Sequence, residues 1–190
     1  MEEVKKDYAE TLERIKKEYP EILKLGGLDA SQKLTNDDQK IILWGKRFIL
    51  MGVDAFPAYM IKSTANIMGE RIAREFLYWF GFSYGETVAQ RYLNIGIPKE
   101  LVPKYTAAAS TFFGGWGISE ILEFDLEKGK LVIKVYNDFE TESAQLNGAD
   151  PTNNFVRGMW AGALSKVIGA KTHATAEFKD GVTIITVEKR

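Results

Sequence analysis

Three side chains in the sequence could take part in proton transfer: two carboxylates in one short stretch, and the only histidine. Glu140 and Glu142 stand two residues apart in DFETE, and His173 stands in the alternating stretch KTHATAEF. A general acid or base needs a pKa tuned by burial or a neighbouring charge, and neither stretch indicates one. We therefore predict a solvated strand edge at Glu140 and Glu142 rather than an acid–base pair. For His173 we predict an exposed or hydrogen-bonded strand position rather than a catalytic role.

Sequence motifs of common enzymes and cofactor-binding proteins are absent. The chain has no GxxxxGK[ST] phosphate loop, no GxGxxG after a strand and no HExxH pair. It has no cysteine, which excludes disulfides, thiolate catalysis and cysteine-ligated zinc or iron–sulfur centres. We therefore predict a protein that is not an enzyme and that holds neither a metal nor a cofactor.

The charge balance and hydropathy limit the classes of partner. The 190 residues include 25 Lys and Arg against 26 Asp and Glu, so the formal net charge is −1 and no basic field attracts nucleic acid. No apolar run is long enough for a membrane span, and the N-terminal stretch lacks the apolar core of a signal peptide. We expect no direct nucleic-acid binding, no membrane insertion and a cytoplasmic location.

Large aromatic residues stand beside runs of small residues in the central and C-terminal parts of the chain. The stretch NNFVRGMWAGALSKVIG reads as a helix, yet it holds two glycines four residues apart, each costing about 1 kcal/mol relative to alanine. Rings among small side chains leave either close backbone packing or a concave apolar space. Eight aromatic residues are candidates for binding a ligand: Phe76, Phe80, Tyr84, Phe112, Trp116, Tyr136, Phe139 and Trp160.

Several elements would have to position these side chains. Apolar residues from Val4 to Ile22 recur at helical spacing and predict an amphipathic helix over 1–25, which either packs on its own domain or forms a dimerisation arm. A polar connector follows. We therefore divide the chain into an N-terminal helical arm and connector, 1–40, and a ligand-binding domain, 41–190.

The remaining pattern predicts an α+β domain. We expect a hairpin with strands over 41–44 and 47–51, and helices over 55–68, 70–96 and 98–113. Strands over 122–126 and 130–136 follow, and then a helix over 153–169 capped by Asp150-Pro151. A last hairpin turns at Asp180-Gly181. The predicted fold is an antiparallel sheet of about four to five strands with helices packed on one face, plus the N-terminal amphipathic helix.

Four stretches resemble the 4-vinyl reductase-type domain, also called the hydrocarbon-binding domain. The first is the segment from Arg47 to Ala89, which holds a pattern like LGxERAxxFLxRxGYxxG over 69–85. The second is the segment 115–142, in which Asp138-Phe139-Glu140 corresponds to the family's SFE step. The third and fourth are the glycine-containing helix and the final hairpin. Together they cover about 41–188. This domain is similar to the ligand-sensing part of phenol- and toluene-responsive transcription activators.

The resemblance implies a fold related to trafficking-complex subunits and nitric-oxide-signalling ligand-binding domains. It also implies homodimerisation and an apolar pocket between the helices and the sheet. Many relatives bind zinc through cysteines, which this chain lacks, so we expect this member of the family to bind no metal by that route. The ATPase and DNA-binding domains of the activators have no counterpart in this sequence, and we infer no reductase activity.

Three functions remain open. The first is a non-catalytic small-molecule sensor with an apolar pocket for a hydrophobic or aromatic ligand. The second is a dimeric protein-interaction scaffold, with the Val4–Ile22 stripe and exposed apolar parts of the Ile72–Tyr92 region as candidate interfaces. The third is an accessory factor in tetrapyrrole or aromatic metabolism, which would need a buried polar constellation.

Overall fold

A computed structural model describes residues 51–190, together with 9–11, 13–14, 17, 35–37, 40–43 and 46–49. Residues 9–11, 13–14 and 17 are helical. The rest of the predicted N-terminal helix, and most of the predicted connector, lie outside the described residues. The division of the chain at residue 40 stays a prediction.

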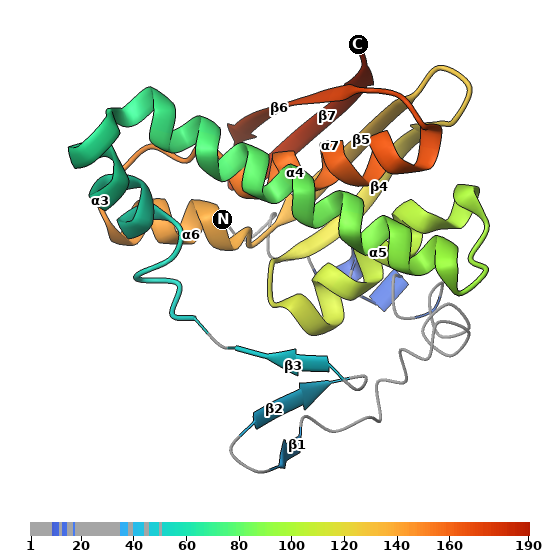
Figure 1. Ribbon diagram of the computed structural model, residues 1–190, viewed down its shortest axis with the longest axis horizontal. Coiled ribbons are helices and arrows are strands. Elements are labelled where there is room, and N and C mark those ends of the chain that lie inside the picture. Colours follow the sequence, from blue (N-terminus) through green and yellow to red (C-terminus); the bar gives the residue numbers. More distant parts are fainter. Residues whose placement is uncertain are drawn as a thin grey trace.

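The main sheet has four antiparallel strands, β4 (Ile118–Asp125), β5 (Lys130–Tyr136), β6 (Thr172–Lys179) and β7 (Val182–Lys189). Their order across the sheet is β4-β5-β7-β6 (Figure 1). Alternate side chains of β5, Leu131, Ile133 and Val135, are buried, as a sheet with one covered face requires. The predicted α+β fold is confirmed.

The last hairpin turns where the sequence predicts. Lys179 pairs with Val182, which leaves Asp180 and Gly181 as a two-residue loop. Both residues have positive φ, 52° and 79°, the geometry of the tight turn that Asp-Gly favours.

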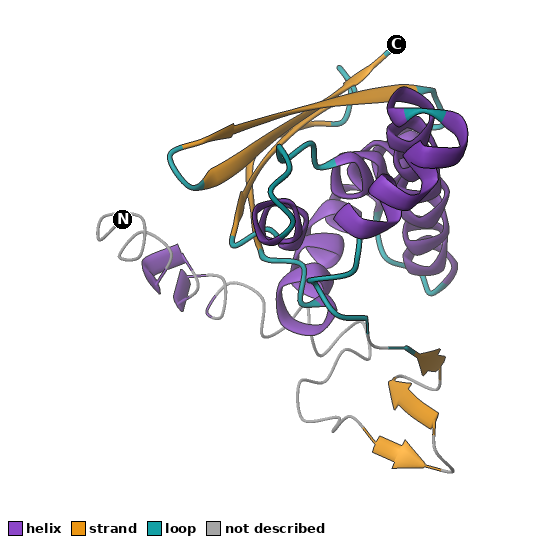
Figure 2. Cartoon of the chain, turned by 90° about the vertical axis from the view of Figure 1, so that its left-hand side faces the viewer, coloured by secondary structure: helices purple, strands orange, loops and turns teal. Residues whose placement is uncertain are grey.

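Helices cover one face of this sheet, as Figure 2 shows. The two longest are α4 (Glu70–Asn94) and α7 (Asn154–Ile168). The others are α3 (Ala58–Met68), the short η1 (Lys99–Leu101), α5 (Val102–Ala109), the π-helical turn η2 (Ser110–Gly114) and α6 (Phe139–Leu146). Because α7 contacts β6 and β7 on one side and α4 on the other, it forms the centre of the core.

The glycines of α7 allow its backbone to touch that of α4. A Cβ on Gly158 would lie 2.1 Å from the Tyr78 carbonyl oxygen, and one on Gly162 would lie 1.9 Å from the Phe82 carbonyl oxygen. On the opposing helix, a Cβ on Gly85 would lie 1.9 Å from the Met159 carbonyl oxygen. Of the two readings of the small residues, close backbone packing is therefore the one that applies at these glycines.

A second, small sheet precedes α3. It consists of β1 (Thr35–Asp37), β2 (Lys40–Leu43) and β3 (Lys46–Phe48), and all its pairings are antiparallel. The predicted 41–51 hairpin is confirmed, with each strand beginning one residue earlier than expected.

Two local predictions were wrong. The stretch DFETE is not a strand edge: its residues from Phe139 onward form α6, with the Asp138 side chain as the N-cap. The helix after it does not begin at Asp150-Pro151, since α7 starts at Asn154. One cause underlies both differences: a buried carboxylate on α6 caps α7.

Candidate functional site

Five aromatic rings surround that of Phe155, on the first turn of α7. The ring centroid of Phe155 lies 5.4 Å from Trp116, 5.6 Å from Phe80 and 5.8 Å from Tyr84. The remaining members are Phe56 and Phe139, at 6.0 and 6.2 Å. These rings, here called the Phe155 cluster, come from α4, α6, α7, the segment before α3 and the segment between η2 and β4.

The glycine contact between α4 and α7 positions this cluster. A Cβ on Gly81 would lie 2.2 Å from the Phe155 carbonyl oxygen, so the two backbones touch at this point. Phe80 and Tyr84 flank Gly81 on α4, and both therefore reach the Phe155 ring. Only glycine at position 81 permits this approach, because any larger residue would place a Cβ against the Phe155 main chain.

The structure brings four of the eight predicted ligand-binding residues together. Phe80, Tyr84, Trp116 and Phe139 all belong to the Phe155 cluster. Phe80 is 51% exposed, so the cluster reaches the surface along α4. Their role in binding a ligand stays a prediction.

The other four predicted residues lie elsewhere. Tyr136 is buried in a second core group, against which the half-buried Phe112 packs. Trp160 is fully buried in the main core, and its Nε1 has no hydrogen-bond partner among the described residues. Phe76 is 56% exposed on the outer face of α4.

Sequence reasoning did not select Phe56 or Phe155 as site residues. Phe155 is buried, and it contacts every other ring of the cluster. The available signal was its place one turn before Gly158, in the helix whose glycines indicate a close approach. No comparable signal in the sequence marks Phe56, which stands 83 positions before Phe139. Only the fold brings these two rings together, with their centroids 6.1 Å apart.

A pocket adjoins the cluster, between the start of α3, the first turns of α4, and α6. It is a shallow, open depression with an enclosed volume of about 40 Å³, and none of the six cluster rings lines it. Apolar and polar side chains both line it: Pro57, Ala58, Ile61, Arg74, Glu140, Ala144, Ala149, Asp150, Thr152 and Asn153. Pro57 and Glu140 are sequence neighbours of the cluster rings Phe56 and Phe139, so the pocket and the cluster share these segments.

Glu140 is the buried carboxylate of this pocket, and only 3% of it is exposed. Its two oxygens accept hydrogen bonds from the main-chain nitrogens of Phe155 at 3.1 Å and Val156 at 2.6 Å. It thereby occupies the N-terminus of α7, where free N–H groups and the helix dipole favour an anion. Burial, with a contribution from the Asp138 carboxylate, nevertheless raises the pKa of Glu140 to about 8.

Asp138 forms a second buried carboxylate beside it. One oxygen accepts from the Glu140 main-chain nitrogen at 3.0 Å, and the other accepts from Thr141 Oγ1 at 3.0 Å and Thr183 Oγ1 at 3.2 Å. Burial raises the pKa of Asp138 to about 6. The pair ties α6 to both α7 and β7, which is a structural role.

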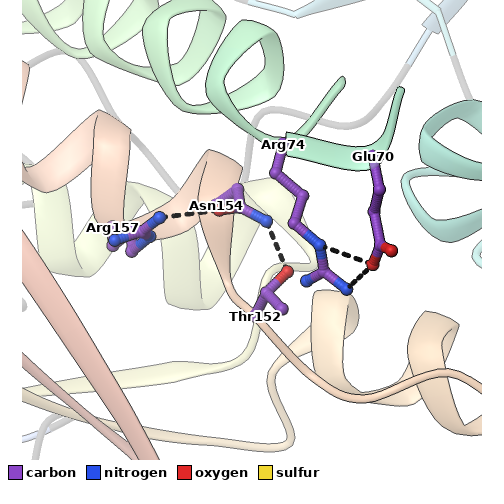
Figure 3. Close-up of polar contacts among 5 residues, drawn as sticks. All are labelled: Glu70, Arg74, Thr152, Asn154 and Arg157. Carbon is purple, nitrogen blue, oxygen red and sulfur yellow. Dashed lines mark hydrogen bonds and ion pairs between the residues drawn. The ribbon is translucent and has the colours of Figure 1, made fainter. Parts of the chain in front are cut away.

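Two groups of polar contacts lie close to the pocket (Figure 3), and two of their members, Arg74 and Thr152, line it. Arg157 donates to Asn154 Oδ1 at 2.7 Å, and Asn154 donates to Thr152. Nearby, Arg74 Nε donates to Glu70 at 2.9 Å. These bonds leave further N–H groups on the Arg74 guanidinium, which carries five donors.

Neither His173 nor the serine of GFSYG forms a catalytic arrangement in the described part of the chain. His173 lies on β6 and contacts Tyr78 Oη at 3.4 Å and Arg190 at 3.2 Å, and burial lowers its pKa. The stretch GFSYG matches the letters GxSxG, but Ser83 lies within α4 with its glycines turned toward α7, rather than at a strand-to-helix turn.

The described residues hold no group of three or more side chains of the types that commonly bind metals. Among them there is also no helix with the length and hydropathy of a membrane span.

Comparisons with known proteins place the fold. No family model and no curated protein matches the chain. It is similar to the crystal structure of the phenol-responsive sensory domain of the transcription activator PoxR with phenol, with a TM-score of 0.70 and 17% identity over 88% of this chain and 90% of that one. The chain therefore has the fold of that sensory domain.

A second solved structure is more distant. A trafficking protein particle complex subunit 3 from Naegleria fowleri, covalently bound to palmitic acid, matches with a TM-score of 0.47 and 13% identity. That match covers 72% of this chain and 95% of the subunit.

Proposed function

We propose that this protein binds a small apolar or aromatic molecule and acts as a non-catalytic sensor. The observation that carries the proposal is the Phe155 cluster, in which six rings from distant segments converge. Aromatic side chains provide large apolar contact areas, and binding sites for small molecules are lined mainly by such groups. The fold supports the same function, since it is shared with a sensory domain whose structure contains phenol.

The ligand would take its orientation from Tyr84. The Tyr84 ring lies 5.4 Å from the Trp116 ring, and among the described residues its hydroxyl has no hydrogen-bond partner. Burial raises the pKa of Tyr84, so the hydroxyl stays neutral and can both donate and accept. We therefore expect a ligand with one polar group on an apolar or aromatic body.

A ligand panel tests this proposal. Phenol, toluene and a short alkane alcohol are each titrated into the full chain, with the melting temperature and tryptophan emission as readouts. We expect at least the ring-bearing compounds to raise the melting temperature, because a ligand that binds the folded state stabilises it. No shift for any compound at millimolar concentration would refute the proposal.

The second part of the proposal is a homodimer, and one observation favours it. Seven large apolar side chains on α3 and α4 are exposed. A monomer rarely leaves so much contiguous apolar surface in water. An accessory role in tetrapyrrole or aromatic metabolism stays a prediction.

A further inference from the structure

Basic and hydrogen-bonding side chains from α4, α7, β6 and the residue after β7 meet at one edge of the main sheet, which β6 forms. The Ala174 main-chain nitrogen on β6 donates to Tyr78 Oη at 3.2 Å, and the Ala174 carbonyl oxygen accepts from Arg157 Nη1 at 3.2 Å. Beside them, Arg190 Nη2 donates to His173 Nδ1 at 3.2 Å, and Tyr78 Oη lies 3.4 Å from the same nitrogen. We call Tyr78, Arg157, His173 and Arg190 the β6-edge cluster.

The positive charge of Arg157 is not used by the fold. Its guanidinium is half-buried and donates to two neutral oxygens, the Ala174 carbonyl and, at 2.7 Å, Asn154 Oδ1. Among the described residues Arg157 forms no ion pair, and its buried Nε has no hydrogen-bond partner. Taking a charge out of water is costly unless an opposite charge accompanies it. Since a neutral amide could donate to the same oxygens, the charge itself points to an anion from solution.

His173 and Arg190 add donors beside this guanidinium. Arginine only donates, so His173 Nδ1 accepts from Arg190 and the neutral ring carries its proton on Nε2. Burial, together with Arg190 and Arg157, lowers the pKa of His173, so the ring is neutral at pH 7 and Nε2 is a donor. Arg190 is exposed, and it too forms no ion pair within the described part of the chain.

The charges that adjoin the cluster are mostly basic. Two carboxylates lie nearby: Glu75, one turn before Tyr78 on α4, and Glu188, which faces His173 across the β6–β7 pairing. Lys189 precedes Arg190, and the Lys171 carbonyl oxygen accepts from the Arg190 main-chain nitrogen. Both lysines are exposed, so together with the two arginines they give four cations against two carboxylates. The local field therefore favours an anion.

We propose that the β6-edge cluster binds the phosphate group of a small molecule. This site shares no residue with the Phe155 cluster, so the inference goes beyond the sensor function and does not rest on it. Guanidinium groups bind phosphate through charge-assisted N–H bonds, and the His173 ring adds a neutral donor. Two guanidinium charges match a phosphate monoester, which carries about −1.5 to −2 at pH 7, better than they match the single charge of a carboxylate.

The single histidine provides the readout. Because His173 is the only histidine in the chain, its Cε1–H signal in an NMR spectrum of the full chain reports on this cluster alone. Inorganic phosphate, titrated at an ionic strength held constant with sodium chloride, should raise the pKa of His173 by about 0.5 unit or more, because the bound anion offsets the two arginines. The rise should saturate with phosphate concentration. A pKa that does not respond, or a response that never saturates, would overturn the proposal.

Substitution of the arginines locates the site. Arg190→Gln should abolish the saturable response, and this change at an exposed position leaves the core intact. Arg157→Gln should also abolish it, while its amide can still donate to the Ala174 carbonyl. Lys166→Gln removes the same charge from an exposed position nine residues further along α7, and it should respond as the wild type does. A saturable response retained in both arginine variants would place the anion elsewhere and contradict the site.

Acetate distinguishes a phosphate site from a carboxylate site. At the same concentration and ionic strength, acetate should raise the pKa of His173 less than phosphate does, because it carries only one negative charge. An equal or larger rise with acetate would overturn the assignment to phosphate. Since these titrations contain no apolar ligand, their outcome is independent of the sensor proposal.

Discussion

The Glu140 carboxylate on α6 accepts a hydrogen bond from the Val156 main-chain nitrogen on α7 at 2.6 Å. One helix therefore supplies the carboxyl group that caps another. This contact also places the pocket, because Glu140 forms part of its wall. It connects the stability of the site to the protonation of a buried group.

We predict that the protein is less stable at pH 8.5 than at pH 6.5 because of Glu140. Its pKa in the folded protein is raised from 4.5 to about 8, so the unfolded chain binds fewer protons across this range. The associated stability is complete below about pH 4.5 and is lost as the pH rises through about 8. Each pKa unit corresponds to about 1.4 kcal/mol, so a fall in melting temperature of at least roughly 2–4 °C is expected.

Glu140→Gln should flatten this pH profile, since a neutral amide does not ionise. Thermal unfolding measured at both pH values checks the prediction. Glu142→Gln is the matched control, because Glu142 is an exposed residue on the same helix. Parallel profiles for Glu140→Gln and the wild type would show that another group sets the pH dependence.

Asp138→Ala should destabilise the protein by about 2–3 kcal/mol, because it removes a helix cap and leaves buried donors unpaired. Thr183→Val removes only one of the bonds to this carboxylate, at 3.2 Å, and should cost less. Denaturant unfolding of the two variants gives both values. An equal or larger loss for Thr183→Val would mean that the carboxylate is not the centre of the network.

Gly162→Ala should destabilise the protein by about 3 kcal/mol or more, through overpacking. The added Cβ would lie 1.9 Å from the Phe82 carbonyl oxygen, and backbone cannot move aside as a side chain can. In a helix free of such contacts, the same change would stabilise by about 1 kcal/mol. The sign of the measured change in unfolding free energy therefore decides whether α4 and α7 touch. Ser83→Ala, at an exposed position of α4, should have little effect.

Trp116→Leu should weaken binding of an aromatic ligand by about tenfold or more, equivalent to about 1.4 kcal/mol. The Trp116 ring contacts both Tyr84 and Phe155, so its loss removes one wall of the cluster. Trp79→Leu changes the same residue type on the outer face of α4, and it should leave ligand affinity unchanged. The two affinities can be compared from the dependence of melting temperature on ligand concentration. Equal effects of the two changes would place the ligand outside the Phe155 cluster.

Much of the fold is determined locally. The alternation of Leu131, Ile133 and Val135 specifies a half-buried strand, and Asp180-Gly181 specifies a tight turn, because both depend on the side-chain and backbone preferences of neighbouring residues. Gly158 and Gly162 likewise indicate a close helix contact, although the sequence leaves the partner helix unspecified. The α+β arrangement follows from the order of these elements.

Only the tertiary structure decided what surrounds each group. Glu140 has the residue type and neighbours of a solvated position, yet it is buried because α7 offers it two N–H donors from 15 and 16 residues away. The aromatic residues were recognisable as a set, but which rings meet depends on the contact of Gly81 with Phe155, which brings Phe80 and Tyr84 together and leaves Trp160 in the core. Local preferences act over a few residues, whereas burial and pKa depend on segments that the fold brings together.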